Sequence, residues 1–336
     1  MKEFKTLNQT FIKSNNQSSK IFNRYLYSLI PFIILIIIYN LINKSFNTIS
    51  NLLISISLSL ITSIIIQYIF NIKNKETDIT KIFKEDNILT ISIILGLFTI
   101  NEPILVIILS NIISIIIKNI SKKITISSSL YGMLFVILYK YITNDLDTPL
   151  TNLSSLSYID TFNNIVKPYG SILDYTLGLT PYYLSPILSI CSFIFLFNKK
   201  SIKYNILLTY ILTFSFIMLV IGMLNNMNIW YLFFQLTTGN ILLLSVLCLG
   251  DYPITPITTE GQVIYGIILG LITSILRFII PELSVIIPLI LGPILLTKTI
   301  NNISFKLKYN HKYYYTILTT CIVLTIITTI IINTII

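Results

Sequence analysis

Long apolar runs separated by short polar segments are the main feature of the sequence. They lie near 25–43, 49–71, 88–100, 103–118, 127–143, 182–198, 204–224, 229–249, 261–280, 283–297 and 314–335. A membrane-spanning helix needs about 20 predominantly apolar residues, and several of these runs reach that length. The runs near 88–100 and 103–118 are shorter and meet at Asn101-Glu102-Pro103, where proline should interrupt a helix. The pattern predicts an all-α polytopic membrane protein with ten or eleven spans, some of them broken or half-helices.

Composition excludes the other broad classes of protein. The 336 residues are 54% hydrophobic and only 11% charged, whereas soluble domains carry about 25% charged residues. Disorder is excluded because Ile, Leu, Phe and Tyr are abundant. The chain contains no alanine, so close packing between membrane helices must depend on Gly, Ser and Thr.

The basic residues indicate a topology. The chain has 23 basic and 13 acidic residues, a net charge of +10. With a cytoplasmic N-terminus, 19 of the 23 fall in inside segments and satisfy the positive-inside rule; these segments are 1–24, 72–87, 118–126, 199–203 and 298–313. Because spans separate the basic segments, they form no continuous face for nucleic acid. The first apolar run is expected to be a retained helix, which places the protein in the cell membrane as a multi-pass protein.

A long polar segment divides the chain. Residues 144–181 fall outside the cell in this topology and separate 25–143 from 182–297, each with about five spans. An odd number of spans per half predicts two inverted repeats, in which sites lie near the midplane at interrupted helices. The remaining parts are a basic cytoplasmic N-terminus, 1–24, and a basic linker with an additional C-terminal transmembrane helix, 298–336.

Two carboxylates are candidates for an ion path. Glu102 and Asp251 each follow a glycine-ended apolar run and precede a proline, and carboxylates inside a membrane commonly mark ion pathways. The alternative is a pair of boundary carboxylates that face lipid headgroups. No metal site is expected, because the single histidine and the three cysteines lack ligand spacing. No dinucleotide fingerprint, P-loop or catalytic triad occurs, so no catalytic residue is predicted and the chain is not expected to be an enzyme by itself.

One block of the sequence resembles a known family. Residues 239–266, which include Gly239-Asn240 and the segment GDYPITPITTEGQVIYG, are similar to the RnfD/NqrB family of redox-driven ion pumps. That family has a helix containing Gly-Asn, a D-P-x-T-S-P-x-T-P-x-G-Q-x-x-x-G block and a helix containing Arg. The matching positions are Asp251, Pro256, Thr258, Gly261, Gln262, Gly266 and Arg277. A weaker resemblance covers roughly 20–297, and the family's Asn-Pro-Phe-Asn-Pro segment is replaced by residues 125–132.

The resemblance implies a cofactor and partners. In the family, a threonine of the extracytoplasmic loop is esterified by FMN, and the matching residue is Thr148 in Asp145-Leu146-Asp147-Thr148-Pro149-Leu150. Gly178 and Thr180 match a Gly-Glu-Thr motif in which Leu179 replaces Glu. The resemblance leaves room for a second, non-covalent flavin. It implies a urea-transporter-like fold. It also implies that the chain is a membrane subunit of a complex that passes electrons from ferredoxin or NADH and moves Na⁺ or H⁺ across the membrane.

The departures from the family motif keep other functions open. Asp145 and Asp147 place negative charge beside an incoming phosphate, which is unfavourable. In the alternative to covalent FMN, Thr148 is part of a Thr-Pro turn in a solvated loop. For the whole chain the alternatives are a non-redox inverted-repeat solute transporter or channel, and a degenerate subunit that only scaffolds its partners.

Overall fold

A computed structural model describes residues 18–42, 46–73, 87–121, 125–143, 186–199, 201–225, 229–237, 240–249, 255–280, 283–309 and 311–335. Within these residues all regular structure is helical, which confirms the all-α class. The elements are α1 (Ser18–Ile42), α2 (Phe46–Lys73), α4 (Ile88–Phe98), α5 (Ile104–Ser121), η1 (Ile126–Ser128), α6 (Ser129–Thr143), α9 (Pro186–Asn198), α10 (Tyr204–Leu224), α11 (Ile229–Thr237), α12 (Ile241–Leu244), η5 (Ser245–Leu249), α13 (Thr259–Ile279), α14 (Ile286–Leu291), η7 (Gly292–Leu296), α15 (Thr297–Tyr309) and α16 (His311–Ile335).

Fewer helices than expected are long enough to span a membrane. In the described part of the chain seven helices meet the length and hydropathy of a span, and the bent pair Tyr231–Thr237 with Ile241–Leu249 makes an eighth. The expectation of ten or eleven spans stays a prediction, because α4, α9 and the apolar part of α16 are shorter than a full span. The 11 residues of α4 extend only about 16 Å. The predicted interruption at Asn101-Glu102-Pro103 is confirmed, since α4 ends at Phe98 and α5 begins at Ile104.

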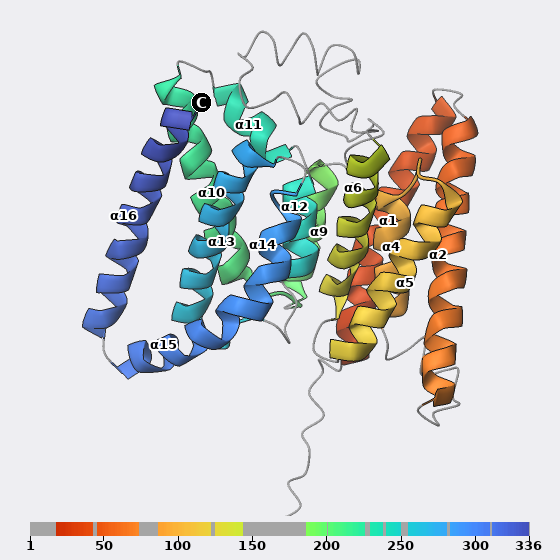
Figure 1. The fold of residues 1–336 in the computed structure, drawn as a ribbon, viewed down its shortest axis with the longest axis horizontal. Helices are drawn as coiled ribbons and strands as arrows, with labels where there is room; N and C mark the ends of the chain where they lie inside the picture. The colour runs from red at the N-terminus through yellow and green to blue at the C-terminus, as the bar shows by residue number, and fades with distance from the viewer. Residues whose placement is uncertain are drawn as a thin grey trace, which may run out of the picture.

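The helices form two groups that meet along the middle of the molecule (Figure 1). One group contains α1, α2, α4, α5 and α6, and the other contains α10, α11, α13 and α16, with α9, α12 and α14 between them. The groups are joined by contacts of α1 with α9 and of α6 with α14. The division of the chain near 144–181 and the inverted relation of the two repeats stay predictions.

Glycine and small hydroxyl residues hold the closest helix pairs together, as the absence of alanine predicted. Ser55 and Ser59 of α2 donate hydrogen bonds of 2.9 Å to the carbonyls of Gly96 and Ser92 on α4. A Cβ on Gly96 would lie 2.9 Å from Ile56 Cα, so only glycine allows α4 to approach α2 this closely. Gly96 was expected to end the helix. It instead lies inside α4, where it packs against α2. Interhelical hydrogen bonds of this kind contribute about 0.6 kcal/mol each in membrane proteins.

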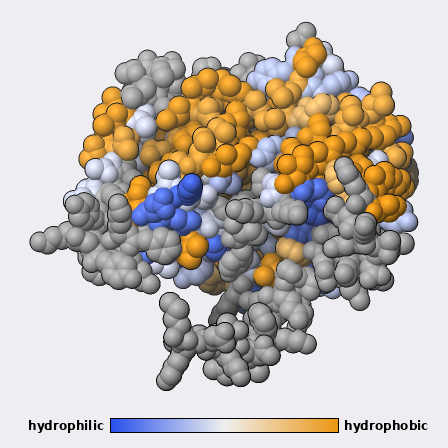
Figure 2. All heavy atoms as spheres, turned by 60° about the horizontal axis from the view of Figure 1, so that its bottom comes forward, coloured by the Kyte–Doolittle hydropathy of each residue, from blue (hydrophilic) through white to orange (hydrophobic). Residues whose placement is uncertain are grey.

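Side-chain contacts test which loops share a side of the membrane. Arg24, near the start of α1, donates hydrogen bonds to the Lys199 carbonyl (2.7 Å) and Ser201 Oγ (3.1 Å). Arg24 and Lys199 thus lie on one side of the bundle, as the predicted topology requires. Glu102 forms an ion pair with Lys140, which the predicted topology places outside. Figure 2 shows hydrophilic residues on the face that is the bottom of Figure 1, next to a broad apolar flank.

The segment expected to be a basic linker is a helix. Residues 297–309 form α15, which runs across the lower edge of the bundle and leads into α16 (Figure 1). The α16 helix then rises beside α13 and α10 and contacts both. On the contacting side Thr325 and Thr329 are buried, four residues apart, whereas Ile322, Val323 and Leu324 are exposed. The outer face of α16 therefore has the apolar surface expected of a lipid-facing helix.

Cysteine labelling should place the two loop sets on opposite sides of the membrane. In a background in which the three native cysteines are serine, Lys199→Cys should react with a membrane-impermeant maleimide only in inside-out vesicles. Ser154→Cys, in the long loop, should react only in right-side-out cells, because the positive-inside rule puts Lys199 in the cytoplasm. Labelling of both positions from one side would contradict the topology.

Candidate functional site

The segment that carries the family resemblance forms, in its described part, a hydrogen-bonded turn before α13. Thr258 has an extended backbone and caps the helix, with its Oγ1 accepting the Gly261 N–H at 3.1 Å. Gln262 Nε2 donates to the carbonyls of Pro256 (3.3 Å) and Ile257 (3.4 Å). The Thr258 cap satisfies one of the N–H groups that a helix start leaves without an intrahelical partner, and the Gln262 amide satisfies carbonyls of the turn. Thr258 and Gln262 therefore have a structural role in this turn.

The helix α15 covers this turn. The Ile257 N–H donates to Asn301 Oδ1 at 3.1 Å, which ties the turn to α15. A Cβ on Gly261 would lie 2.7 Å from Thr258 Oγ1 and 3.0 Å from Ser304 Oγ. Glycine is thus required at 261 because the Thr258 cap and α15 both approach its backbone closely.

Lys203 reaches the same turn from the start of α10. Its Nζ donates to Thr255 Oγ1 at 2.7 Å and to the carbonyls of Thr255 and Pro256, both at 3.2 Å. Thr255 is only 5% exposed, so this contact is made at the edge of the packed interior. The next residue but one, Asn205, donates to Gln262 Oε1 at 3.4 Å. The beginning of α10 and the turn before α13 are therefore one hydrogen-bonded unit.

Several predicted site residues lie outside the described residues. These are Thr148, Gly178 and Thr180, proposed for flavin, and Asp251, proposed for the ion path. The described residues nearest to Asp251 in the chain are Leu249 and Thr255, which are 2% and 5% exposed. The role of Asp251 stays a prediction.

Glu102 is paired with a lysine. Its carboxylate Oε1 lies 2.6 Å from Lys140 Nζ, and the side chains of Glu102 and Lys140 are 9% and 26% exposed. Lys140 lies in the last turn of α6, and Glu102 lies in the break between α4 and α5. An ion that reached this carboxylate would compete with the Lys140 ammonium. The proposed role of Glu102 in an ion path stays a prediction, and the structure adds Lys140 as its counter-charge.

Arg277 is a buried cation at the far end of α13. It is 4% exposed, and its Nε donates to Gln235 Oε1 on α11 at 3.0 Å. Its Nη1 lies 3.5 Å from Ser284 Oγ. A guanidinium inside a membrane is costly without such partners. Thr258 and Arg277 are about 28 Å apart along α13 at 1.5 Å per residue, so the residues that match the family motif do not converge on one site.

The Gly-Asn pair marks a break and does not lie within a continuous helix. The expected single helix over 229–249 is divided into α11, which ends at Thr237, and α12, which begins at Ile241, with a bend of 52°. Asn240 has a φ of 57°, in the left-handed region that asparagine tolerates better than most residues. The break gives the second group of helices an interrupted span, as α4 and α5 give the first.

The fold and these contacts can be compared with known proteins. A model of the NQR2, RnfD, RnfE family matches residues 5–303, most of the chain. The chain belongs to this family. As a member with several membrane-spanning helices, it is a membrane subunit of an Rnf- or Nqr-type electron-transport and ion-transport complex. No curated protein matches the chain.

The family match ends inside α15. It therefore includes Asn301, which holds the turn before α13, and excludes α16. The α16 helix covers α10 and α13, the most extensively packed helix pair. In this NQR2/RnfD/RnfE family member, α16 therefore covers a surface of α10 and α13 that the family-matched part of the chain does not cover.

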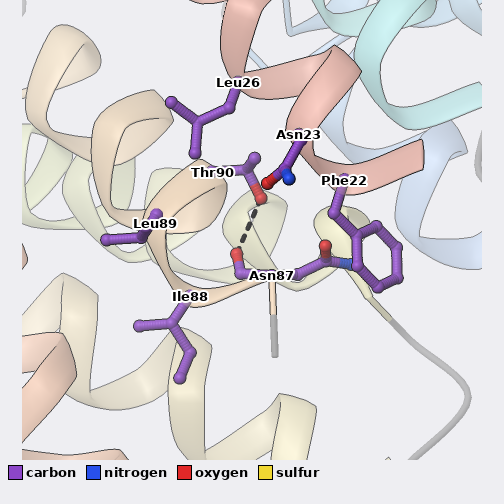
Figure 3. A pocket seen from close by; sticks show the side chains of 7 residues that line it. All are labelled: Phe22, Asn23, Leu26, Asn87, Ile88, Leu89 and Thr90. Carbon is purple, nitrogen blue, oxygen red and sulfur yellow. Dashed lines mark hydrogen bonds between the residues drawn. The ribbon is translucent and has the colours of Figure 1, made fainter. Parts of the chain in front are cut away.

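A small pocket lies between the starts of α1 and α4 (Figure 3). Its walls include Phe22, Asn23, Asn87 and Thr90, and the Thr90 hydroxyl donates to the Asn87 carbonyl at 2.6 Å. Its volume is about 10 Å³, room for about one water molecule and far below the roughly 300–1,000 Å³ of typical ligand pockets. It does not fit a flavin ring system, and we assign no cofactor to it.

Sequence reasoning missed three of the residues that organise this family member. Lys203 and Asn301 gave no signal, because a lysine in a basic loop and an asparagine in a polar segment are ordinary. Gln235 did give one, since an amide within the apolar run near 229–249 is expected to have a polar partner. That partner, Arg277, was singled out only by the family motif.

Proposed function

We propose that this family member couples electron transfer to the movement of Na⁺ or H⁺ across the cell membrane, with FMN esterified to Thr148. The observation that carries the proposal is the family match over residues 5–303. Oxidation of the electron donor belongs to partner subunits, because the chain has no nucleotide-binding fingerprint. FMN supplies one-electron and two-electron transfer when bound, and the chain supplies its position and the surrounding charge.

The ends of the long loop support an extracytoplasmic position for the flavin. The loop leaves α6 after Thr143 and enters α9 at Pro186. The end of α6 is also the end that carries Lys140 and its partner Glu102. A threonine hydroxyl provides the acceptor that a phosphoester bond requires, so Thr148 fits this chemistry. In this arrangement the flavin lies near the Glu102–Lys140 pair and away from Lys203, and Gly178 and Thr180 belong to the same loop.

Charges at both ends of the bundle support an ion path. Asp251 precedes the turn held by Lys203, and Glu102 lies at the opposite end, paired with Lys140. The interrupted helices α4–α5 and α11–α12 free backbone carbonyls that can coordinate a cation. We propose that an ion passes between these ends and that the redox state of the flavin controls its passage.

A specific observation favours a second candidate, a non-redox solute transporter. The residues before Thr148 and at position 179 depart from the family's flavin motifs, with Asp145, Asp147 and Leu179 in place of the family's residues. A chain that had lost flavin would keep the same membrane fold, since fold alone does not determine function.

Covalent flavin should depend on one hydroxyl group. The purified wild-type protein, denatured and run on a gel, should show flavin fluorescence, and Thr148→Ala should abolish it because no acceptor oxygen remains. Thr148→Ser, which keeps a hydroxyl, should retain part of the signal, and Thr151→Ala is the matched control in the same loop. A wild-type protein without fluorescence would exclude covalent FMN. Flavin released by denaturation would then support a non-covalent site, and its absence would favour the transporter.

A further inference from the structure

The turn before α13 offers a set of oxygen atoms to a cation. The carbonyls of Thr255 and Pro256 and the Thr255 hydroxyl all lie within 3.2 Å of Lys203 Nζ. These carbonyls precede the helix, so they take no part in the backbone hydrogen bonds of α13, and the Pro256 carbonyl also accepts from the Gln262 amide. Three oxygens that converge on one point are the ligands that hard cations prefer, and carbonyls freed by an interrupted helix coordinate Na⁺ in transporters.

The backbone of the turn is held by contacts other than those of Lys203. Gln262 Nε2 donates to the Pro256 carbonyl at 3.3 Å, and Asn301 Oδ1 accepts the Ile257 N–H. Thr258 caps α13 directly after the turn. Because these contacts do not involve Lys203, removal of the ammonium should leave the backbone of the turn in place.

We propose that the oxygens of Thr255 and Pro256 form a monovalent-cation site that the chain occupies with its own Lys203 ammonium. An ammonium group and Na⁺ carry the same charge and bind the same kind of oxygen. Lys203 is the residue before α10, so the cation is tethered to the start of a packed helix. The tether keeps the site filled at any Na⁺ concentration and makes the turn insensitive to the ion. This inference does not depend on flavin or on partner subunits.

Removing the tethered charge should make the site available to Na⁺. In detergent, the thermal unfolding midpoint of Lys203→Met should be roughly 2 °C higher in 0.2 M NaCl than in 0.2 M choline chloride, because ligand binding to the folded state stabilises it. The wild-type protein and Lys203→Arg should show no difference between the two salts. The control is Lys199→Met, which removes an exposed lysine from the same loop and should behave like the wild type.

A second substitution tests whether the response arises at these oxygens. Adding Thr255→Val to Lys203→Met removes the hydroxyl ligand and should abolish most of the Na⁺-specific shift. If Lys203→Met does not fold, Lys203→Gln keeps a donor for the turn and takes its place in the same comparison. Equal unfolding midpoints of Lys203→Met, or of Lys203→Gln in its place, in both salts would show that Lys203 only stabilises the turn. An equal Na⁺ response of the wild-type protein would place the binding elsewhere. Either result overturns the proposal.

Discussion

Gly266→Ala should destabilise the protein by about 2 kcal/mol or more, the upper part of the range for overpacked cores. A Cβ at this position would lie 2.7 Å from the backbone oxygen of Ile206 and would overlap Thr209 Oγ1. The Thr209 side chain could rotate away, but the Ile206 carbonyl cannot move unless the whole of α10 moves. A Cβ on Gly270, one turn later, would meet Thr213 and the Tyr210 carbonyl in the same way. With a Cβ at Gly266, α10 and α13 would therefore have to separate.

The matched control for this prediction is Gly222→Ala. It also lies inside a helix, so it gains the same helix propensity, about 1 kcal/mol. Its new Cβ would meet only the Tyr231 side chain, at 3.2 Å. We expect this variant to unfold near the wild-type temperature in detergent, whereas Gly266→Ala should unfold at a clearly lower temperature and give little monodisperse protein. Equal midpoints for the two variants would contradict the packing argument.

Asp251→Asn should reduce donor-driven ion uptake at least tenfold while the complex still assembles. Asparagine has nearly the same shape and keeps an acceptor oxygen, but it carries no charge with which to attract a cation. The measurement is Na⁺ uptake and acidification in vesicles energised by the reduced donor, with assembly judged by co-purification of the partner subunits. Normal uptake would remove Asp251 from the ion path.

Two further carboxylates complete this experiment. Glu102→Gln tests the other candidate and should also slow uptake, with Lys140 then left without its counter-charge. Glu260→Gln is the control, because Glu260 lies in the first turn of α13, close to Asp251 in the sequence, and has no proposed role in ion passage. A loss of uptake in Glu260→Gln would show that any change of charge near this turn disturbs transport, and the assignment of Asp251 would fail.

The sequence alone was sufficient for the class of fold. Apolar runs of spanning length and basic residues in alternate loops are local properties, and they predicted the helices and the common side of Arg24 and Lys199. Proline at 103 predicted the break between α4 and α5. The lack of alanine predicted packing by glycine and hydroxyl residues, which Gly266 confirms. The family motif added the membership that the match over 5–303 confirms.

Only the tertiary structure decided what the motif residues do. Lys203 binds oxygens 52 and 53 residues away, and Asn301 holds a turn 44 residues before it. Such pairs depend on how α10, α13 and α15 are placed in space, which hydropathy does not encode. The expected linker includes α15, in which Ser304 lies close to Gly261. Hydrophobicity along the chain thus determined which segments form apolar helices, whereas the partners of each polar group depended on the close approach of helices distant in the sequence.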